Sequence, residues 1–226
     1  MVGENPFRRL SGRTAWNCRL NRWRKVLGPA PCLAMTGLAK SMLEIQATAI
    51  PDVKVLIPKR FSDHRGVFSE IYNRRRFFEA GITEEFVQDN YSLSVEAGTV
   101  RGLHFQSPPF AQVKLVRVTR GRILDVVVDI RRSSPTYGQH VALELSAENG
   151  WQLLVPAGFA HGFCTLEPNT ETQYKVSAYY SAAHDHGLAF NDPELGIEWP
   201  VEADRAVLSD KDRKQPRLAE LPLYFE

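Results

Sequence analysis

The fold of this chain is decided by two stretches of sequence, GTVRGLHFQ at residues 98–106 and GWQLLVPAGFAH at residues 150–161. Each stretch begins with a glycine, and five residues then separate that glycine from His104 in the first stretch and from Pro156 in the second. Branched and aromatic residues between turn-forming glycines and prolines are typical of short β-strands. The two stretches therefore predict strands that carry, or lead to, a histidine.

Short strands continue on both sides of these stretches from Ile50 onward. Turn residues such as Gly66, Gly81 and Gly121 interrupt them about every ten residues, a spacing typical of antiparallel sandwiches and barrels. The pattern shows no strand–helix alternation, which disfavours a doubly wound parallel sheet. We therefore predict one all-β domain with a short helix at 75–80, a proline-rich strap after Pro193, and strands at 53–57, 67–71, 86–88, 99–105, 112–119, 123–130, 141–145, 152–155 and 172–178.

The composition is that of an ordinary globular protein. The chain has 226 residues, of which 43% are hydrophobic and 24% charged, so extended disorder and fibrous architectures are excluded. No apolar run approaches the ~18 residues that a membrane span requires. Three cysteines, two of them near the N-terminus, cannot build a disulfide framework.

The small net charge of +2 conceals two unlike parts. Residues 1–41 hold eight basic residues and one acidic residue, which leaves 20 basic and 25 acidic residues for 42–226. An Arg-rich, acid-poor arm fits a targeting segment, a nucleic-acid-binding tail or an unstructured leader. Because Glu4 and Pro6 interrupt an amphipathic start and Met42 stands where a domain could begin, we predict a disordered basic extension over 1–41 and one folded domain over 42–226.

The two glycine–histidine stretches resemble the paired motifs of the cupin superfamily, which folds as a jelly-roll barrel. A metal-binding cupin places a second histidine two residues after the first, on the same strand face, but this chain has Gln106 there. The glutamate expected a few residues later is also missing, and two imidazoles alone make a weak divalent site. The sequence therefore predicts a site without a metal, in which His104 is free for proton chemistry.

The other histidines carry less information. His161 has two interpretations: it caps the turn after Gly158, or it joins the site that His104 defines. A single histidine among loop residues or at a strand end is usually exposed or satisfied in the core, and this interpretation is assigned to His64, His140, His184 and His186.

Eight short blocks extend the resemblance from superfamily to family. They occur in order over about residues 44–223: FSDHRGVFSE (61–70), FVQDNYS (86–92), RGLHFQ (101–106), KLVR (114–117), DIRRSSPTYG (129–138), LSAEN (145–149), PAGFAHGF (156–163) and YK (174–175). Together they resemble the dTDP-4-dehydrorhamnose 3,5-epimerase family. The resemblance implies an all-β fold, a cupin jelly-roll (double-stranded β-helix) barrel with a few short helices.

The resemblance also implies a reaction that uses no cofactor, the inversion of C3 and C5 of dTDP-4-dehydro-6-deoxy-D-glucose to give dTDP-4-dehydro-L-rhamnose. Both carbons lie α to the C4 ketone, so inversion needs a base on one face, an acid on the other and a group that stabilises the enolate oxygen. At the matching positions, His104 is the expected base, Asp212 orients it and Tyr174 is the expected acid. Lys114, which lies on an apolar strand face, is expected to stabilise the enolate.

The nucleotide end of such a substrate requires arginines for the pyrophosphate and aromatic and polar groups for the base. Strand alternation puts Arg101 on the face opposite His104, so Arg101 reaches the site only if the chain bends at Gly102. The resemblance implies substrate-binding roles for Arg65, Phe68, Glu70, Gln88, Asn90, Arg101, Tyr180 and Lys211, and we add His161.

The expected partners follow from the same resemblance. Early strands of this family cross to a second subunit, which implies a homodimer that shares the substrate site. We expect a nucleotide sugar as substrate, no nucleic acid or membrane partner, and a cytoplasmic location. Two alternatives remain open at this point: an epimerase of C3 or C5 alone that acts on a related nucleotide sugar, and a non-catalytic, sugar-binding cupin.

Overall fold

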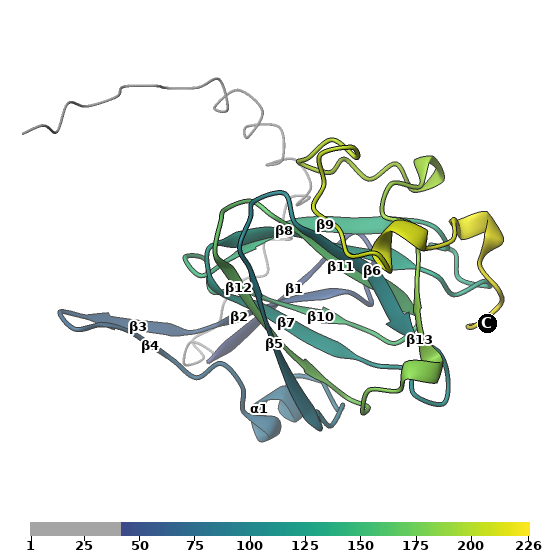
Figure 1. Ribbon diagram of the computed structural model, residues 1–226. Helices are drawn as coiled ribbons and strands as arrows, with labels where there is room; N and C mark the ends of the chain where they lie inside the picture. Colours follow the sequence, from purple (N-terminus) through teal and green to yellow (C-terminus); the bar gives the residue numbers. More distant parts are fainter. Residues whose placement is uncertain (1–41) are drawn as a thin grey trace, which may run out of the picture. The chain divides into compact units, whose positions relative to one another are not determined.

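Short strands are the main regular secondary structure of residues 42–226, the part of the chain that the computed structural model describes (Figure 1). One α-helix, α1 (Arg74–Glu79), and four 3₁₀ turns, η2 (Ala182–His184), η3 (Pro193–Leu195), η4 (Asp212–Lys214) and η5 (Leu218–Glu220), complete this part. The strands are β1 (Leu43–Ala47), β2 (Lys54–Pro58), β3 (Arg60–Asp63), β4 (Gly66–Ser69), β5 (Gln88–Ser94), β6 (Val100–Gln106), β7 (Lys114–Arg120), β8 (Arg122–Asp129), β9 (His140–Ser146), β10 (Gln152–Val155), β11 (Phe159–Thr165), β12 (Thr170–Val176) and β13 (Asp185–Gly187). The predicted extension over 1–41 lies outside the described residues, and the domain boundary at residue 42 stays a prediction.

The strands form two antiparallel sheets and a separate hairpin. A six-stranded sheet has the order β1-β2-β10-β7-β12-β5, and a five-stranded sheet has the order β13-β6-β11-β8-β9. Strands β3 and β4 pair only with each other, so they form a hairpin outside both sheets. The all-β jelly-roll fold expected from the sequence is confirmed.

The main core lies between the two sheets. Valine and phenylalanine side chains of β7, β8 and β11, such as Val118, Val127 and Phe163, are almost completely buried in it. The inward-facing residues of each strand alternate with residues that face away, as the pleat requires. Burial of this apolar surface is the principal force that holds the sheets face to face.

A second core lies on the outer face of the five-stranded sheet. Leu103 and Phe105 of β6 and Val126 of β8 face outward into it, where Leu188 and Leu218 cover them. These covering residues belong to the C-terminal segment, residues 188–226, which Figure 1 shows in yellow-green over the upper right of the barrel. The proline-rich strap predicted after Pro193 therefore exists, and its side chains cover part of the outer face of the five-stranded sheet.

Strand β5 is where the sequence pattern gave the wrong bounds, because the strand runs from Gln88 to Ser94 instead of 86–88. Its side chains at even positions face inward and are polar, whereas Tyr91 and Leu93 face outward and are exposed. This is the reverse of the usual strand pattern, so the segment resembles a loop in the sequence. The inverted polarity arises because β5 lines the cavity described below.

Strand β11 was also missing from the prediction. All seven of its residues are buried, because one face packs in the main core and the other in the outer core. Such a strand has no polar–apolar alternation, and its internal Gly162 reads as a turn signal. Strands β1, β3 and β13 were missed as well, whereas β10 has the predicted bounds and the helix begins one residue early. Within residues 42–226, no helix is long and apolar enough to cross a membrane.

Candidate active site

A cavity of about 190 Å³ opens between the two sheets. Strands β5, β7 and β12 of the six-stranded sheet form one side, and β6 and β13 of the five-stranded sheet form the other. Its lining is almost entirely polar: Gln88, Asn90, His104, Phe105, Gln106, Gln112, Lys114, Tyr174, Tyr180 and Asp185. Six residues expected from the sequence to serve the site, three of them in catalytic roles, are therefore brought together here.

His104 is held by a buried carboxylate. Its Nε2 lies 2.5 Å from Oδ1 of Asp212, which turn η4 of the C-terminal segment carries. The Asp212 side chain is 5% exposed and that of His104 is 32% exposed. A carboxylate that accepts the Nε2 proton fixes the tautomer and leaves Nδ1 as the nitrogen that can accept another proton.

The carboxylate of Asp212 remains ionised in this environment. Burial raises its pKa, but the hydrogen bond and charge of His104 and the hydrogen bond with Ser209 hold the net pKa below the usual range. The backbone N–H of Gly102 also donates to this carboxylate. The pair thus combines an oriented imidazole with an anion that can stabilise its protonated form.

Tyr174 faces His104 from the opposite sheet. It lies in β12, where its backbone pairs with Asn90 of β5 and Val116 of β7. Burial is the main cause that raises the pKa of its phenol; the charge of Arg101 lowers this pKa and that of Asp185 raises it. The phenol is therefore protonated at neutral pH and can act as a proton donor.

Lys114 lies at the start of β7 with its side chain inside the cavity. It is 8% exposed, and its Nζ donates a hydrogen bond of 3.1 Å to the carbonyl oxygen of His104. Burial lowers the pKa of Lys114 to about 8, against the charges of Asp185 and Asp125, which raise it. The ammonium group is thus present at neutral pH, but the nearby carboxylates do not fully offset the cost of burying its charge. A developing anion on the substrate would therefore be a favourable partner for it.

Arg101 does reach the side of the cavity, although simple strand alternation predicts the opposite face. Strand β11 pairs His161 with His104 but Phe163 with Arg101, so three steps along β6 oppose two steps along β11. This bulge brings Arg101 and His104 to the same face. The guanidinium then donates to Oγ of Ser94 and to the carbonyl oxygen of Leu93, both at 3.1 Å, on β5 of the other sheet.

His161 does not cap a turn, so that interpretation is wrong. It lies within β11 as the register partner of His104, and its Nε2 is 2.9 and 3.0 Å from the two carboxylate oxygens of Asp125. Both side chains are buried. Asp125 was not anticipated, although a lone carboxylate inside the apolar run of β8 is a signal that could have found it.

Three side chains from different parts of the chain contact one another at the cavity: Tyr180 and Asp185 of its lining, and Lys211. The Tyr180 hydroxyl donates to Asp185 at 3.1 Å, and Lys211 Nζ donates to the same carboxylate oxygen at 2.5 Å. Gln88 joins this group, because its Oε1 accepts from the backbone N–H of Tyr180 at 3.2 Å while its Nε2 donates to Asn90 at 2.9 Å. Asp185 had been given no role from the sequence.

Six expected substrate-binding residues are outside the cavity lining of this chain: Arg101, His161 and Lys211, described above, and three that lie on the β3–β4 hairpin or directly after it. Arg65 is on the β3–β4 hairpin and pairs with Asp63, and Phe68 on the same hairpin is 69% exposed. Glu70 follows the hairpin and pairs with Arg76 at 3.1 Å. The single chain therefore does not bring the hairpin to its own cavity.

Gln106 has a structural task in the position where metal-binding cupins carry a histidine. Its Nε2 donates to the carbonyl oxygens of Phe110 and Tyr179, and its Oε1 accepts from the backbone N–H of Ser181. The amide is thus fully occupied in tying two loops to β6. Among residues 42–226, no three His, Cys, Asp or Glu side chains gather closely enough to hold a metal ion.

The fold and the site together define a class, jelly-roll barrels with an acid–base centre between two sheets. The profile of the dTDP-4-dehydrorhamnose 3,5-epimerase family matches residues 47–220, and the chain belongs to this family. It is 53% identical over 193 residues to a dTDP-4-dehydrorhamnose 3,5-epimerase of Sinorhizobium fredii, which covers 85% of this chain and 98% of the relative.

Solved structures of the same family agree with this assignment. The dTDP-4-dehydrorhamnose 3,5-epimerase of Bacillus anthracis, with TDP and PPi bound, is 54% identical with a TM-score of 0.75, over 77% of this chain and 99% of that one. A dTDP-6-deoxy-D-glucose-3,5-epimerase of Legionella pneumophila, in complex with dTDP-4-keto-L-rhamnose, is 41% identical with a TM-score of 0.78, over 81% of this chain and 98% of that one.

Proposed function

We propose that the chain is a nucleotide-sugar 3,5-epimerase that converts dTDP-4-dehydro-6-deoxy-D-glucose to dTDP-4-dehydro-L-rhamnose by way of an enolate. The observation that carries this proposal is one cavity with a carboxylate-bound histidine on one sheet, a protonated phenol on the other and a buried ammonium group beside them. Two solved relatives that hold TDP or dTDP-4-keto-L-rhamnose support the choice of substrate.

His104 is the base of the proposed mechanism. Its Nδ1 takes the proton from C3 or C5, and the electron pair of the broken C–H bond moves into the C4 carbonyl to form the enolate. Asp212 keeps the imidazole in the tautomer that can accept this proton and stabilises the imidazolium that results. Lys114 stabilises the charge on the enolate oxygen.

Tyr174 completes each inversion from the opposite face. It gives its phenolic proton to the carbon that His104 has deprotonated, which leaves an imidazolium and a phenolate. Proton exchange with water then restores both groups for the second carbon. Each inversion therefore places a solvent-derived hydrogen on the sugar.

The nucleotide is bound at the mouth of the cavity. Arg101 and Lys211 supply positive charge for the pyrophosphate, and the remaining polar contacts come from Gln88, Asn90 and Tyr180 of the cavity lining. The exposed hairpin residues Arg65 and Phe68, together with Glu70, serve the site of a second copy of the chain, which makes the protein a homodimer. An aromatic ring that is 69% exposed at a hairpin gains stability when a partner covers it.

Deuterium uptake in heavy water tests the proposal. With no metal added, the enzyme and the keto sugar nucleotide should incorporate deuterium at both C3 and C5, as NMR or mass spectrometry would show. His104→Ala should lower the rate of uptake about 10³-fold, whereas Tyr174→Phe should impair inversion more than exchange. Intact nucleotide binding with no uptake at either carbon would refute the enzyme and leave a sugar-binding cupin.

The same experiment separates the closest alternative. Uptake at one carbon only, with that carbon alone inverted, would identify an epimerase of C3 or C5. The cytoplasmic location and the absence of nucleic-acid and membrane partners also remain proposals, which cell fractionation followed by immunoblotting can test.

A further inference from the structure

Strands β6 and β11 approach each other unusually closely at two glycines. A Cβ placed on Gly162 would lie 2.7 Å from the carbonyl oxygen of Arg101 and 3.1 Å from the Cα of Gly102. A Cβ placed on Gly102 would lie 2.6 Å from the Cα of Gly162. The atoms in the way belong to the backbone, so a side chain at either position could be accommodated only by moving a strand.

The close approach coincides with the bulge in β6. The register between the strands shifts between His161 and Phe163, which places Gly162 opposite the extra residue of β6. Gly102 has a φ of 118°, a conformation that favours glycine, whereas the φ of Gly162 is outside the left-handed region. Alanine at Gly162 is thus acceptable to its own backbone and is excluded only by β6.

The bulge decides which way the residues of β6 point. Leu103 faces the outer core, while His104 and Arg101 both face inward, toward the cavity and toward β5. A regular strand would send residues three positions apart to opposite faces. The extra residue therefore puts a candidate base and a candidate pyrophosphate ligand on one side of the same strand.

We propose that Gly162 is a positioning residue of this active site. Because Gly162 has no side chain, the backbone of β6 can approach it closely and form the bulge, and the bulge turns Arg101 and His104 to the same face. The inference rests on the proposed function, because both residues take their roles from it. Gly162 lies outside the cavity lining, so it acts only through β6.

Two glycine-to-alanine variants on either side of β6 test the proposal. Gly187 of β13 pairs with His104 on the other edge of β6, but the nearest atoms that a Cβ there would meet form the end of the Gln215 side chain, which can move. Gly162→Ala should lower kcat for deuterium uptake about 10²-fold, raise KM and change the pH profile, because the His104–Asp212 distance and the place of Arg101 both change. Gly187→Ala should stay within about threefold of the wild type.

Loss of stability is separated from loss of positioning by a third variant. Val126→Ala removes buried volume from β8 directly opposite Gly162 and adds no atom against the β6 backbone, so it should lower Tm yet keep kcat. A folded Gly162→Ala enzyme with wild-type kcat, or an equal loss of kcat in Val126→Ala, would overturn the inference. A wild-type enzyme with no uptake at all would instead refute the proposed function.

Arg101→Gln keeps the inference testable if Gly162→Ala does not fold. Arg101 is exposed, so this variant leaves no cavity, and the placement of its charge beside Tyr174 is a direct consequence of the bulge. The pKa of Tyr174 should rise further in Arg101→Gln, as ¹³C-tyrosine NMR would report, with Tyr174→Phe for assignment. An unchanged tyrosine titration would place Arg101 away from the site and contradict the inference.

Discussion

Burial sets the chemistry of Lys114 more than any neighbouring charge does. A surface lysine has a pKa near 10.4 and is a permanent cation at physiological pH. Inside the cavity the pKa falls to about 8, so the ammonium group is lost within the range in which enzymes are assayed. The hydrogen bond to the carbonyl oxygen of His104 also ties the lysine to the strand that carries the base.

Turnover should fall as pH rises through about 8. The lowered pKa means that Lys114 is cationic below this value and neutral above it, and only the cation stabilises an enolate. Tyr174 cannot cause this fall in turnover, the alkaline limb of the pH profile, because the pKa of its phenol is raised above the ordinary value of 10.0. A kcat–pH profile tests this, and Lys114→Met should lose the limb together with about 10² of the rate. A flat wild-type profile across pH 8 would contradict the role of Lys114.

Asp185→Asn should move that limb to lower pH. The Asp185 carboxylate is the largest charge effect that raises the pKa of Lys114, so its loss leaves burial less opposed. The change also removes the carboxylate partner of Lys211, whose positive charge then lowers the pKa of Lys114 as well. Asp89→Asn is a matched control, since Asp89 is exposed and pairs with Lys175. A limb that shifts equally in both variants would argue against a specific effect of Asp185.

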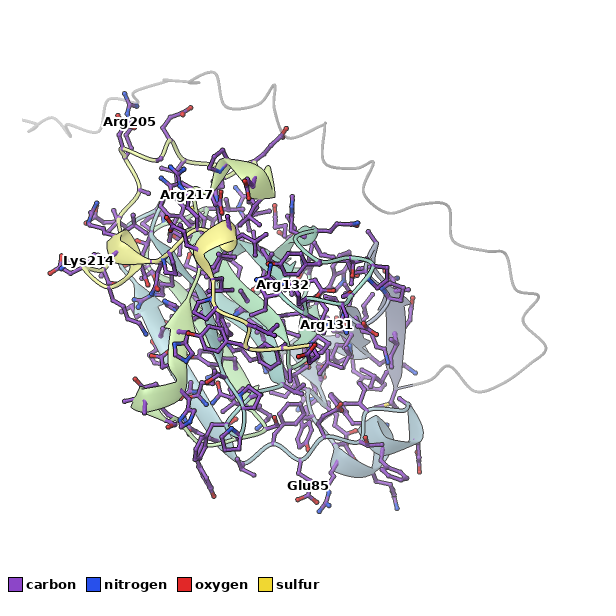
Figure 2. The ribbon with its side chains drawn as sticks, turned by 90° about the vertical axis from the view of Figure 1, so that its right-hand side faces the viewer. Glu85, Arg131, Arg132, Arg205, Lys214 and Arg217 are labelled. Carbon is purple, nitrogen blue, oxygen red and sulfur yellow. The ribbon has the colours of Figure 1, made fainter. Side chains whose placement is uncertain are left out.

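At the scale of elements, the DIRRSSPT motif (residues 129–136) forms a hydrogen-bonded network at the end of β8. Asp129 accepts hydrogen bonds from Arg131, Ser134 and Thr136, and Arg131 also pairs with Asp52 at 2.9 Å. Figure 2 shows Arg131 beside Arg132, whose backbone N–H donates to the carbonyl oxygen of Phe225. This network thus connects β8, the β1–β2 turn and the C-terminal segment.

Asp129→Asn should destabilise the fold by about 3 kcal/mol, because a partly buried guanidinium loses its fully buried carboxylate partner and keeps only the half-exposed Asp52. Burial raises the pKa of Asp129, but its hydrogen bonds lower the net value to about 2. The stabilisation is therefore complete above the ordinary pKa of ~3.9 and is lost as pH falls toward 2. Urea unfolding at several pH values measures both effects. If the two proteins still differed equally at acid pH, Asp129 would not be the cause.

How far the sequence predicts each element depends on what its two faces touch. Strands with one apolar face, such as β7, were found because the alternation of apolar and polar residues along the sequence indicates which face packs in a core. Strand β5 was misplaced because its inward residues serve the cavity, and β11 was missed because both of its faces are buried. His104, Lys114 and Tyr174 were found through motifs, but the bulge that redirects Arg101 depends on a glycine in another strand, which no local pattern reveals.

At the scale of the whole molecule, the β3–β4 hairpin lies outside both sheets of a single chain and keeps its aromatic side chains exposed. Phe61 and Phe68 lie on it with their ring centres 6.4 Å apart, and both are exposed. Phe68→Ser should therefore weaken dTDP binding and shift sedimentation toward the monomer. Val95→Ser is the control, because Val95 is similarly exposed but lies after β5, away from the hairpin. If Phe68→Ser left both affinity and mass unchanged, the shared site would be disproved.

The charge of the whole chain gives little information about this chemistry. Residues 42–226 carry more acidic than basic residues, so the mildly basic pI comes from residues 1–41. Removal of residues 1–41 should therefore leave kcat and KM unchanged in a steady-state assay. A large loss of turnover in a truncated protein of normal Tm would assign a catalytic task to the extension.

The place of Asp212 in the C-terminal segment has a consequence for the life of the protein in the cell. Every strand of both sheets is complete before the ribosome reaches this residue. The segment is then held by late contacts, among them the stacking of Tyr224 on His186. A nascent chain has thus made every strand while it still lacks the carboxylate that orients His104, and the outer core gains its last covering side chains only with the C-terminal segment.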